Sequence, residues 1–274
     1  MTQKEIAQFQ QEILTWYAAH QRDLPWRKSR DPYRILVSEI MLQQTQVKRV
    51  IPKFISWFDV FPTVHDLAVA SVSDVLSLWS GLGYNRRALN LKKAAQIVSE
   101  KYNGIFPHTE KELLALPGIG QYTARALLCF AFDQQVTVID TNVRKVILLK
   151  FMDSRLRGND KINDKEISDF AEKILPKGKA YEWNQALMDY SSAMLKEHKI
   201  PIPKQSKFIG SHRYYRGQIL KRLLEKKEIE LKELGKLLKK DYSDKEEAWV
   251  KSLVSELKDE GFVETEKEKI KLIS

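Results

Sequence analysis

Hydrophobic residues recur at helical spacing along most of the chain. In residues 6–19 they place Phe9, Ile13, Trp16 and Tyr17 on the inward face, which predicts an amphipathic helix. A second pattern predicts a continuous helix over residues 35–50. Helical patterns continue between residues 62 and 103 and over residues 166–174, 183–196, 215–224, 231–239 and 246–260. Near the C-terminus the spacing changes to alternation, which predicts two short strands at residues 262–264 and 270–272.

The helical pattern breaks at Pro117, Gly118 and Gly120 and resumes at Gln121. Two glycines so close to a proline predict a tight hairpin between two helices. The backbone N–H groups at the start of the second helix suit an anion such as a DNA phosphate. Further along, the apolar run 136–139 delivers Asp140 to the start of another helix. From the residues alone, Asp140 is compatible with a helix N-cap or with a shielded active-site carboxylate.

Glu39 is the other acid in an unusual place, because it lies within the otherwise apolar run Leu36–Leu42. A carboxylate there must be paired, or it must have a raised pKa. Without further information, a helix-capping or core salt-bridge role is the simpler interpretation. The polar residues 43–46 come next, where an amphipathic helix would carry an apolar position. They suit hydrogen bonding to bases or phosphates, or else a solvated helix face.

A glycine-marked turn, Gly81 to Gly83, separates two helical patterns and is followed by Tyr84. An aromatic side chain at such a turn can wedge into a base stack, or it can pack in the core. Arg86 and Arg87 come directly afterwards and suit contacts to phosphates, or simple solvation.

The composition favours a polyanionic partner. The chain has 274 residues, a formal net charge of +10 and a pI near 9.4. No apolar run approaches the ~20 residues that span a bilayer, and no signal-peptide pattern is present, so we expect a cytoplasmic protein with no membrane partner. The sole cysteine, Cys129, lies on an apolar helix face, and the five histidines lack metal-ligand spacing. We therefore predict no metal at the catalytic centre.

Several motifs together resemble one family. LPWR, DPYRILVSEIMLQQTQV, LWSGLGYNRRALNL, LPGIGQYTA and IDTNV occur in the order and spacing of MutY-type adenine DNA glycosylases, within the helix-hairpin-helix DNA glycosylase superfamily. The similarity covers roughly residues 20 to 195. It implies an all-α, two-lobed glycosylase domain over residues 1–206. Residues 207–274, with three helices and a strand hairpin, are interpreted as a small winged-helix-like (α+β) DNA-binding domain.

The chain departs from this family in two respects. Leu195 stands where the first of four cluster-binding cysteines is expected, so no iron–sulfur cluster is expected. The usual Nudix-like domain, which reads 8-oxoguanine, is also not expected here. The cofactor prediction is therefore none, with room for a monovalent cation at the contact between hairpin and phosphate.

The resemblance implies a monofunctional glycosylase that flips adenine out of a mispair with 8-oxoguanine or G and hydrolyses its N-glycosidic bond. Glu39 would protonate the base and Asp140 would stabilise the cationic sugar, with Tyr122 and Asn142 positioning the acids. The base pocket would include Arg27, Trp26 and Leu42. The predicted DNA-binding residues are Gln43, Gln44, Thr45, Tyr84, Arg86, Arg87, Leu116, Gly118, Ile119, Gly120, Gln121, His212 and Arg213.

The expected partner is double-stranded DNA with mispaired or oxidised bases, bound by a monomer associated with the nucleoid. Two alternatives stay open. A mismatch-specific thymine or uracil DNA glycosylase resembles this scaffold and can share both the acid and the tyrosine. A non-catalytic protein that binds mispairs would not need Glu39 or Asp140 at all.

Overall fold

The computed structural model describes residues 2–151, 163–197, 207–239 and 241–273. The chain divides into two compact units. The first comprises Met1–Ile40 and Phe106–Ile202, and the second comprises Met41–Ile105 and Pro203–Ser274. Helices dominate both units, and a three-stranded sheet is formed near the C-terminus, so the predicted fold class is confirmed.

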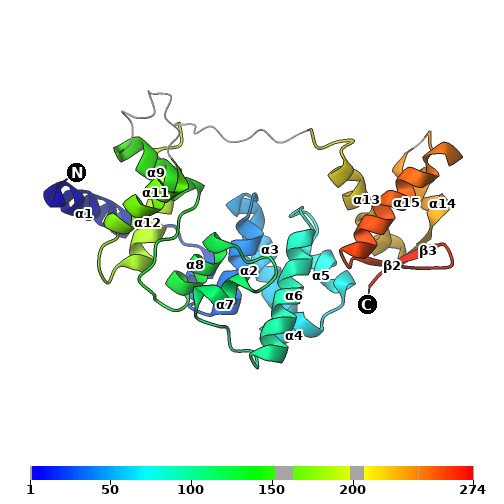
Figure 1. Cartoon of the computed structure of the whole chain (residues 1–274), viewed down its shortest axis with the longest axis horizontal. Helices are drawn as coiled ribbons and strands as arrows, with labels where there is room; N and C mark the ends of the chain where they lie inside the picture. The colour runs from blue at the N-terminus through cyan, green and yellow to red at the C-terminus, as the bar shows by residue number, and fades with distance from the viewer. Residues whose placement is uncertain (1, 152–162, 198–206, 240, 274) are drawn as a thin grey trace. The chain divides into compact units, whose positions relative to one another are not determined.

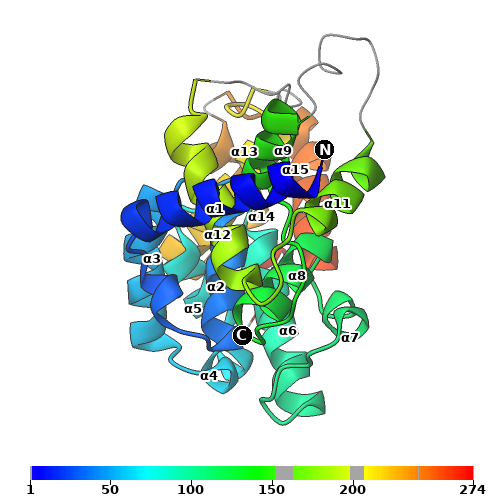
Figure 2. The same ribbon diagram turned by 90° about the vertical axis from the view of Figure 1, so that its left-hand side faces the viewer.

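The first unit is helical and packs around α12. Its elements are α1 (Gln3–His20), η1 (Pro25–Lys28), α2 (Pro32–Leu42), α7 (Glu110–Leu114), α8 (Gln121–Phe130), α9 (Thr141–Phe151), α11 (Asp164–Lys173) and α12 (Ala180–Met194). The last two residues of α2, after Ile40, belong to the second unit. In Figure 2, α1 crosses α12, and α12 also contacts α9. The ring of Phe9 meets that of Trp183 edge-on at 5.7 Å between centroids, so aromatic side chains form the centre of this core.

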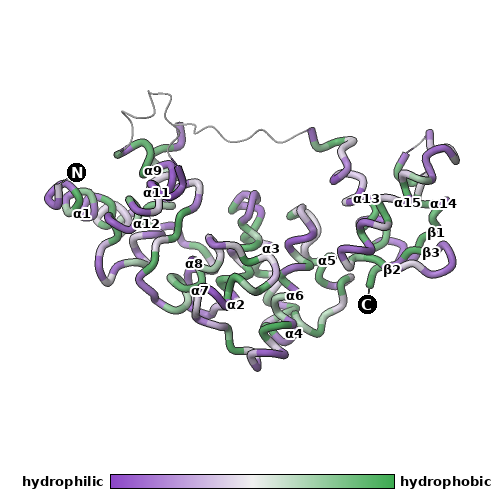
Figure 3. Tube along the Cα trace, in the orientation of Figure 1, coloured by the Kyte–Doolittle hydropathy of each residue, from purple (hydrophilic) through white to green (hydrophobic). Residues whose placement is uncertain are grey.

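The second unit combines helices with the sheet. Its elements are α3 (Val47–Val60), α4 (Val64–Val69), α5 (Val72–Trp79), α6 (Arg86–Lys101), α13 (His212–Lys226), β1 (Glu228–Glu230), α14 (Leu231–Leu238), η2 (Asp244–Glu246), α15 (Glu247–Asp259), β2 (Val263–Glu266) and β3 (Lys269–Leu272). The strands are antiparallel in the order β1-β3-β2, and Ile270 pairs with both Ile229 and Thr265. Figures 1 and 3 show α13 and α15 beside this sheet, with hydrophobic and hydrophilic residues alternating along both helices.

The structure corrects one predicted helix and adds one strand. The helix predicted over residues 35–50 is wrong: α2 ends at Leu42 and α3 begins at Val47. Gln44 has a φ of 54°, which no α-helix accommodates, so the chain turns there. The sequence pattern also missed β1, which is only three residues long. The polar, glycine-containing sequence of residues 153–165 predicts an exposed loop, and most of this stretch lies outside the described residues. No helix of the described part combines the length and apolarity that a membrane crossing needs.

Asn184 of α12 fixes the segment that leads to Asp140. Its side-chain Oδ1 accepts a hydrogen bond from the Val138 backbone N–H at 2.8 Å. Its Nδ2 donates to the carbonyls of Val136 at 3.0 Å and Ala180 at 2.8 Å. Asn184 is 1% exposed, so these bonds form away from water. Residues 136–138 are irregular, and one amide supplies the hydrogen bonds that a neighbouring strand would otherwise provide.

We expect Asn184→Ala to lower the free energy of unfolding by about 2–3 kcal/mol, because it leaves buried backbone groups without partners. Urea unfolding followed by tryptophan fluorescence measures the change. Gln8→Ala on the exposed face of α1 is the matched control and should stay within about 0.5 kcal/mol of the parent chain. Equal stability of both variants would show that Asn184 is not a support.

Candidate active site

Glu39 is buried within α2 and is 7% exposed. Its helix neighbours are apolar, with Leu36 and Ile40 also buried, because α2 presents a hydrophobic face to the core. Burial raises the pKa of Glu39 from its ordinary value of 4.5 to about 7. The Tyr122 hydroxyl hydrogen-bonds to the carboxyl group and opposes this rise, while the nearby charge of Asp140 adds to it. Glu39 is therefore poised to hold or release a proton near neutral pH.

Tyr122 reaches Glu39 from the first turn of α8, two residues after Gly120. Burial, followed by the charges of Glu39 and Asp140, raises the pKa of Tyr122 well above its usual range. The hydroxyl thus keeps its proton and acts as a donor to a carboxylate. It is a neutral side chain that links the hairpin helix to the acid on α2.

Asp140 occupies the position before α9 and accepts several hydrogen bonds. Its Oδ1 accepts from the Val143 backbone N–H at 2.7 Å, and its Oδ2 accepts from Asn142 Nδ2 at 2.8 Å. Burial raises the pKa of Asp140 above its ordinary value, and these amide donors oppose that rise. Asp140 therefore caps α9, and it also lies close enough to Glu39 for their charges to interact.

The two acids differ in how their charges are supported. The roles implied by the resemblance, a protonated Glu39 and an ionised Asp140, call for opposite pKa directions, but burial raises the pKa of both groups. Asp140 has N–H donors from backbone and side chain, whereas Tyr122 is the donor that acts on Glu39. Because donors to a carboxylate favour its charged form, Asp140 is better suited to remain ionised while Glu39 carries a proton.

A buried carboxylate missed by sequence reasoning, Asp189 of α12, holds the predicted pocket residue Arg27. Arg27 donates to both oxygens of Asp189, at 2.7 and 2.8 Å, and Arg22 Nε donates at 2.6 Å. Asp189 is 1% exposed. Its partners lower its pKa despite its burial. The positive charge of Arg27 in turn lowers the pKa of Glu39. An acid on the buried face of helix 183–196 was the signal that could have found it.

The predicted DNA-binding residues of the helix-hairpin-helix element form two groups, one buried and one exposed. The side chains of Leu116 and Ile119 are buried and anchor the turn. Gly118, Gly120 and Gln121 are exposed, and Gly118 has a φ of 78°, which glycine adopts without strain. No side chain caps the N-terminus of α8 at Gly120. Backbone N–H groups at this exposed helix start can therefore meet an anion.

Four predicted DNA-binding residues of the second unit, Gln43, Gln44, Thr45 and Tyr84, lie on two turns that Arg87 joins. Its guanidinium donates to the carbonyls of Met41 and Gln43 at 3.1 and 2.6 Å and to those of Leu82 and Gly83 at 3.1 and 3.0 Å. It also reaches Thr45 Oγ1 at 3.1 Å. Burial lowers the pKa of Arg87 to about 10. The structure thus places Arg87 inside the turns, whereas the side chain of its neighbour Arg86 is 71% exposed.

Gln44 and Tyr84 project from these two turns with left-handed backbone conformations. Their φ values are 54° and 49°, and Tyr84 is 43% exposed. Such conformations are costly for residues with a Cβ and persist when surrounding contacts impose them. The Arg87 hydrogen bonds are contacts of that kind.

The remaining predicted residues differ in burial and in their contacts. Trp26 is buried within η1, and Leu42 is half-buried at the end of α2. His212 Nε2 lies 3.1 Å from a carboxylate oxygen of Glu256, and Arg213 stacks near Phe208. In the part of the chain that the structure describes, no three His, Cys, Asp or Glu side chains are grouped to hold a metal ion.

Comparison with known proteins places this site in a family. The model of the HhH-GPD superfamily base excision DNA repair proteins matches residues 37–177, just over half of the chain. The adenine DNA glycosylase of Buchnera aphidicola subsp. Baizongia pistaciae is 41% identical over 182 residues, which are 66% of this chain and 51% of that protein. The adenine DNA glycosylase of Mycolicibacterium smegmatis is 47% identical over 137 residues, or 50% of this chain and 47% of that protein.

Among solved structures, a thermostable thymine-DNA glycosylase is similar with a TM-score of 0.65 and 33% identity. That match covers 72% of this chain and 90% of the other. An endonuclease III–DNA complex, at 23% identity and a TM-score of 0.62, shares the fold. The chain thus spans about half the length of the adenine glycosylases it matches, and nearly all of the thymine-DNA glycosylase.

The raised pKa of Glu39 predicts a pH-dependent stability cost. The folded protein keeps this proton up to about pH 7, whereas an unfolded chain releases it near 4.5, so the stability contributed here is lost as pH rises. Glu39→Gln cannot ionise. Its free energy of unfolding, relative to the parent chain, should therefore increase by about 2–3 kcal/mol from pH 5 to pH 8. Urea titrations at both pH values measure this, and a constant difference would contradict the burial argument.

Proposed function

Because the chain belongs to the HhH-GPD superfamily of base excision DNA repair proteins, we propose that it is a monofunctional DNA glycosylase that removes adenine mispaired with 8-oxoguanine or G. The observation that carries this proposal is the pair of buried acids in the first unit. Glu39 has a pKa near 7 and Asp140 is supported by amide donors. The family match over residues 37–177 includes both acids, and the similarity to adenine DNA glycosylases supports the choice of base.

The proposed reaction uses Glu39 as a general acid. The bond between the sugar C1′ and the base nitrogen breaks, its electron pair leaves with adenine, and the Glu39 proton passes to N7 of the base. Ionised Asp140 stabilises the cationic sugar, much as carboxylates do in glycoside hydrolysis. Water then adds to C1′ and returns a proton to Glu39. Adenine must leave the base stack first, and Gln44 and Tyr84 are proposed to fill or wedge that stack.

The chain's own residues argue against imine chemistry and against an iron–sulfur cluster. α8 contains no lysine that could form an imine with the sugar, and Tyr122 stands near its start. Strand cleavage through such an imine is therefore not expected. An iron–sulfur cluster needs about four thiolate ligands. The residues of this sequence do not fit one, because the single cysteine, Cys129, is buried in α8 and hydrogen-bonded to Asn184.

A second candidate function is removal of thymine or uracil from a mispair with G. It is favoured by the similarity to a thymine-DNA glycosylase, because the match extends over 90% of that protein's chain. A protonated acid is better matched to adenine, whose ring nitrogen N7 accepts a proton directly. We therefore keep adenine as the proposed substrate and separate the two candidates by experiment.

The substrate assignment is tested by single-turnover base release from labelled duplexes with A opposite 8-oxoguanine, A opposite G, T opposite G and U opposite G. We expect release of adenine, reduced at least about 100-fold by Glu39→Gln because the general acid is lost. Glu12→Gln, an exposed acid on α1, is the matched control and should react as the parent chain does. Borohydride should trap no covalent DNA adduct.

Release of T or U without adenine would move the chain to the pyrimidine candidate. No release from any of the four duplexes would exclude the enzyme proposal for these substrates.

The pH dependence of base release tests the role of Glu39 directly. The rate should fall above about pH 7, tenfold per pH unit, as Glu39 loses its proton. The hydrogen bond from Tyr122 lowers the pKa of Glu39, so Tyr122→Phe should move this alkaline limb to higher pH. Tyr102→Phe, a substitution in the second unit, should leave it in place. An alkaline limb that Tyr122→Phe leaves unmoved would mean that another group controls the rate.

A further inference from the structure

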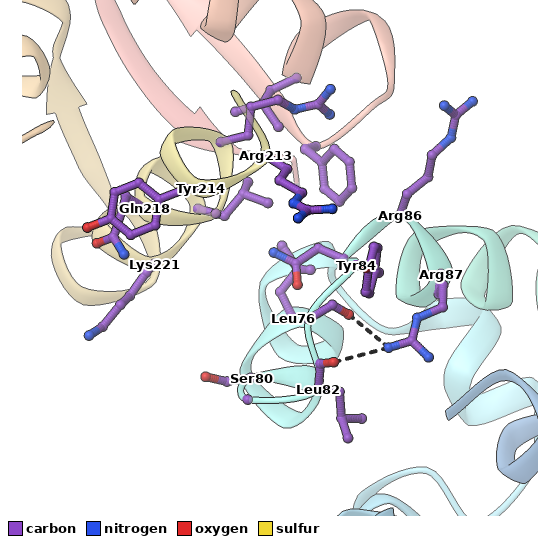
Figure 4. A pocket seen from close by; sticks show the side chains of 18 of the residues that line it. Leu76, Ser80, Leu82, Tyr84, Arg86, Arg87, Arg213, Tyr214, Gln218 and Lys221 are labelled. Atoms are coloured by element: carbon purple, nitrogen blue, oxygen red, sulfur yellow. Dashed lines mark hydrogen bonds between the residues drawn. The ribbon is translucent and has the colours of Figure 1, made fainter. Parts of the chain in front are cut away.

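The second unit contains a large cavity, and of its lining residues the proposed excision uses only Gln44 and Tyr84. Its volume is about 960 Å³, and its walls are the turn from Gly81 to Tyr84, the first turn of α6, and α13. Figure 4 shows Arg213 and Tyr214 of α13 on one side and Tyr84 and Leu82 on the other. All of these residues belong to the same compact unit. The cavity is large enough for more than one nucleotide.

The lining of this pocket is strongly basic. Glu260 is the acid among its lining residues. The cationic lining residues are Arg49, Arg86, Arg87, Arg213, Arg216 and Lys221. Arg216 Nη2 neutralises Glu260 at 2.7 Å, and Arg87 is engaged by backbone carbonyls. Among the described residues no acid lies within ion-pair distance of Arg49 or Lys221, and both side chains are exposed.

Aromatic rings lie between these cations. Tyr84 is 43% exposed and Phe208 is 56% exposed, although both are large apolar groups. Tyr214 contacts Phe208 edge-on at 5.6 Å between centroids. Exposed aromatic faces among cations are the combination that binds unpaired nucleotides, because bases stack on the rings while phosphates meet the positive charges.

Among the described residues of the C-terminal region, α15 and the sheet lack such a surface. In a helix-turn-helix arrangement the second helix, here α15, would enter the major groove. Yet α15 carries Glu247, Glu256 and Asp259 against Lys251 and Lys258, and Lys251 pairs with Glu247. The lysine charges on the strands are also balanced by acids, since Lys269 pairs with Glu228 and Lys271 pairs with Glu264. By contrast, α13 has five lysines and arginines against one glutamate. Arg216, Arg222 and Lys226 pair with acids, whereas no acid of the described residues lies within ion-pair distance of Lys221.

We propose that the pocket between the Gly81–Tyr84 turn and α13 binds unpaired nucleotides of a DNA strand, and that α13, not α15, is the DNA-binding helix of the C-terminal region. Lys221 and Arg49 meet backbone phosphates, and Tyr214 and Tyr84 stack on bases. The choice of DNA as the nucleic acid rests on the proposed function. The pocket itself is independent of Glu39 and Asp140, which belong to the first unit.

The test measures binding of the full chain to fluorescein-labelled dT12 and to a fully paired duplex by anisotropy over a range of salt concentrations. Lys221→Gln and Arg49→Gln should each reduce the slope of log K against log salt for dT12 by about 0.7, the contribution of one single-strand phosphate. Tyr214→Ala should weaken dT12 binding by about fivefold or more through lost stacking. Lys251→Gln on α15 is the matched control and should bind as the parent chain does. Thermal unfolding verifies that each variant is folded.

Unchanged dT12 binding by the folded Lys221, Arg49 and Tyr214 variants would overturn the inference, as would absence of dT12 binding by the parent chain. A loss confined to the paired duplex would also overturn it, because the pocket would then contact only intact DNA. If Lys251→Gln were the only substitution that weakened binding, α15 and not α13 would be the DNA-binding helix. If the parent chain released no base from any mispair yet bound dT12 through Lys221, the proposed function would fail and this inference would stand.

Discussion

The burial of two carboxyl groups within reach of each other's charge is the constraint on which the first unit depends. Glu39 and Asp140 both have raised pKa values, so ionising both at once is costly. The cost is distributed unevenly. Asp140 sits where α9 needs a capping acceptor, and the helix amides offset part of its desolvation. Glu39 lies in the apolar face of α2, where its protonated form has the lower free energy near neutral pH. A proton donor and a stable anion thus arise from one arrangement.

In the second unit, the guanidinium of Arg87 joins two turns of the chain through their backbone carbonyls. Arg87 binds carbonyl oxygens of two turns, and these turns carry Gln44 and Tyr84 in strained conformations. Carbonyls accept from a planar guanidinium in fixed directions, so the two turns keep one geometry. The rigidity of both turns therefore has its origin in one half-buried guanidinium.

Much of the site could be predicted because its signals are local. The glycines of the hairpin, the apolar run before Asp140 and the acid in α2 are each visible within a few residues. The features that were missed depend on distant partners. Asp189 meets Arg22 and Arg27 from the start of the chain, and β1 gains its strand partner from residues 269–271. The break at Gln44 escaped prediction because glutamine is a good helix former and no glycine or proline marks the turn.

Arg86 and Arg87 show a further limit of sequence reasoning. They are chemically identical neighbours, and both suit phosphates equally well. The start of α6 turns one toward backbone carbonyls and leaves the other exposed, and that direction follows from packing rather than from composition.

The position of Cys129 has a consequence for oxidative conditions. It is the only cysteine of this sequence, fully buried in α8, and burial raises the pKa of its thiol to about 12. Oxidants and alkylating reagents attack the thiolate, which this environment suppresses. The thiol becomes reactive only when the helix core around Asn184 opens. The rate of alkylation in the folded protein therefore reports how often that core opens, without any engineered label.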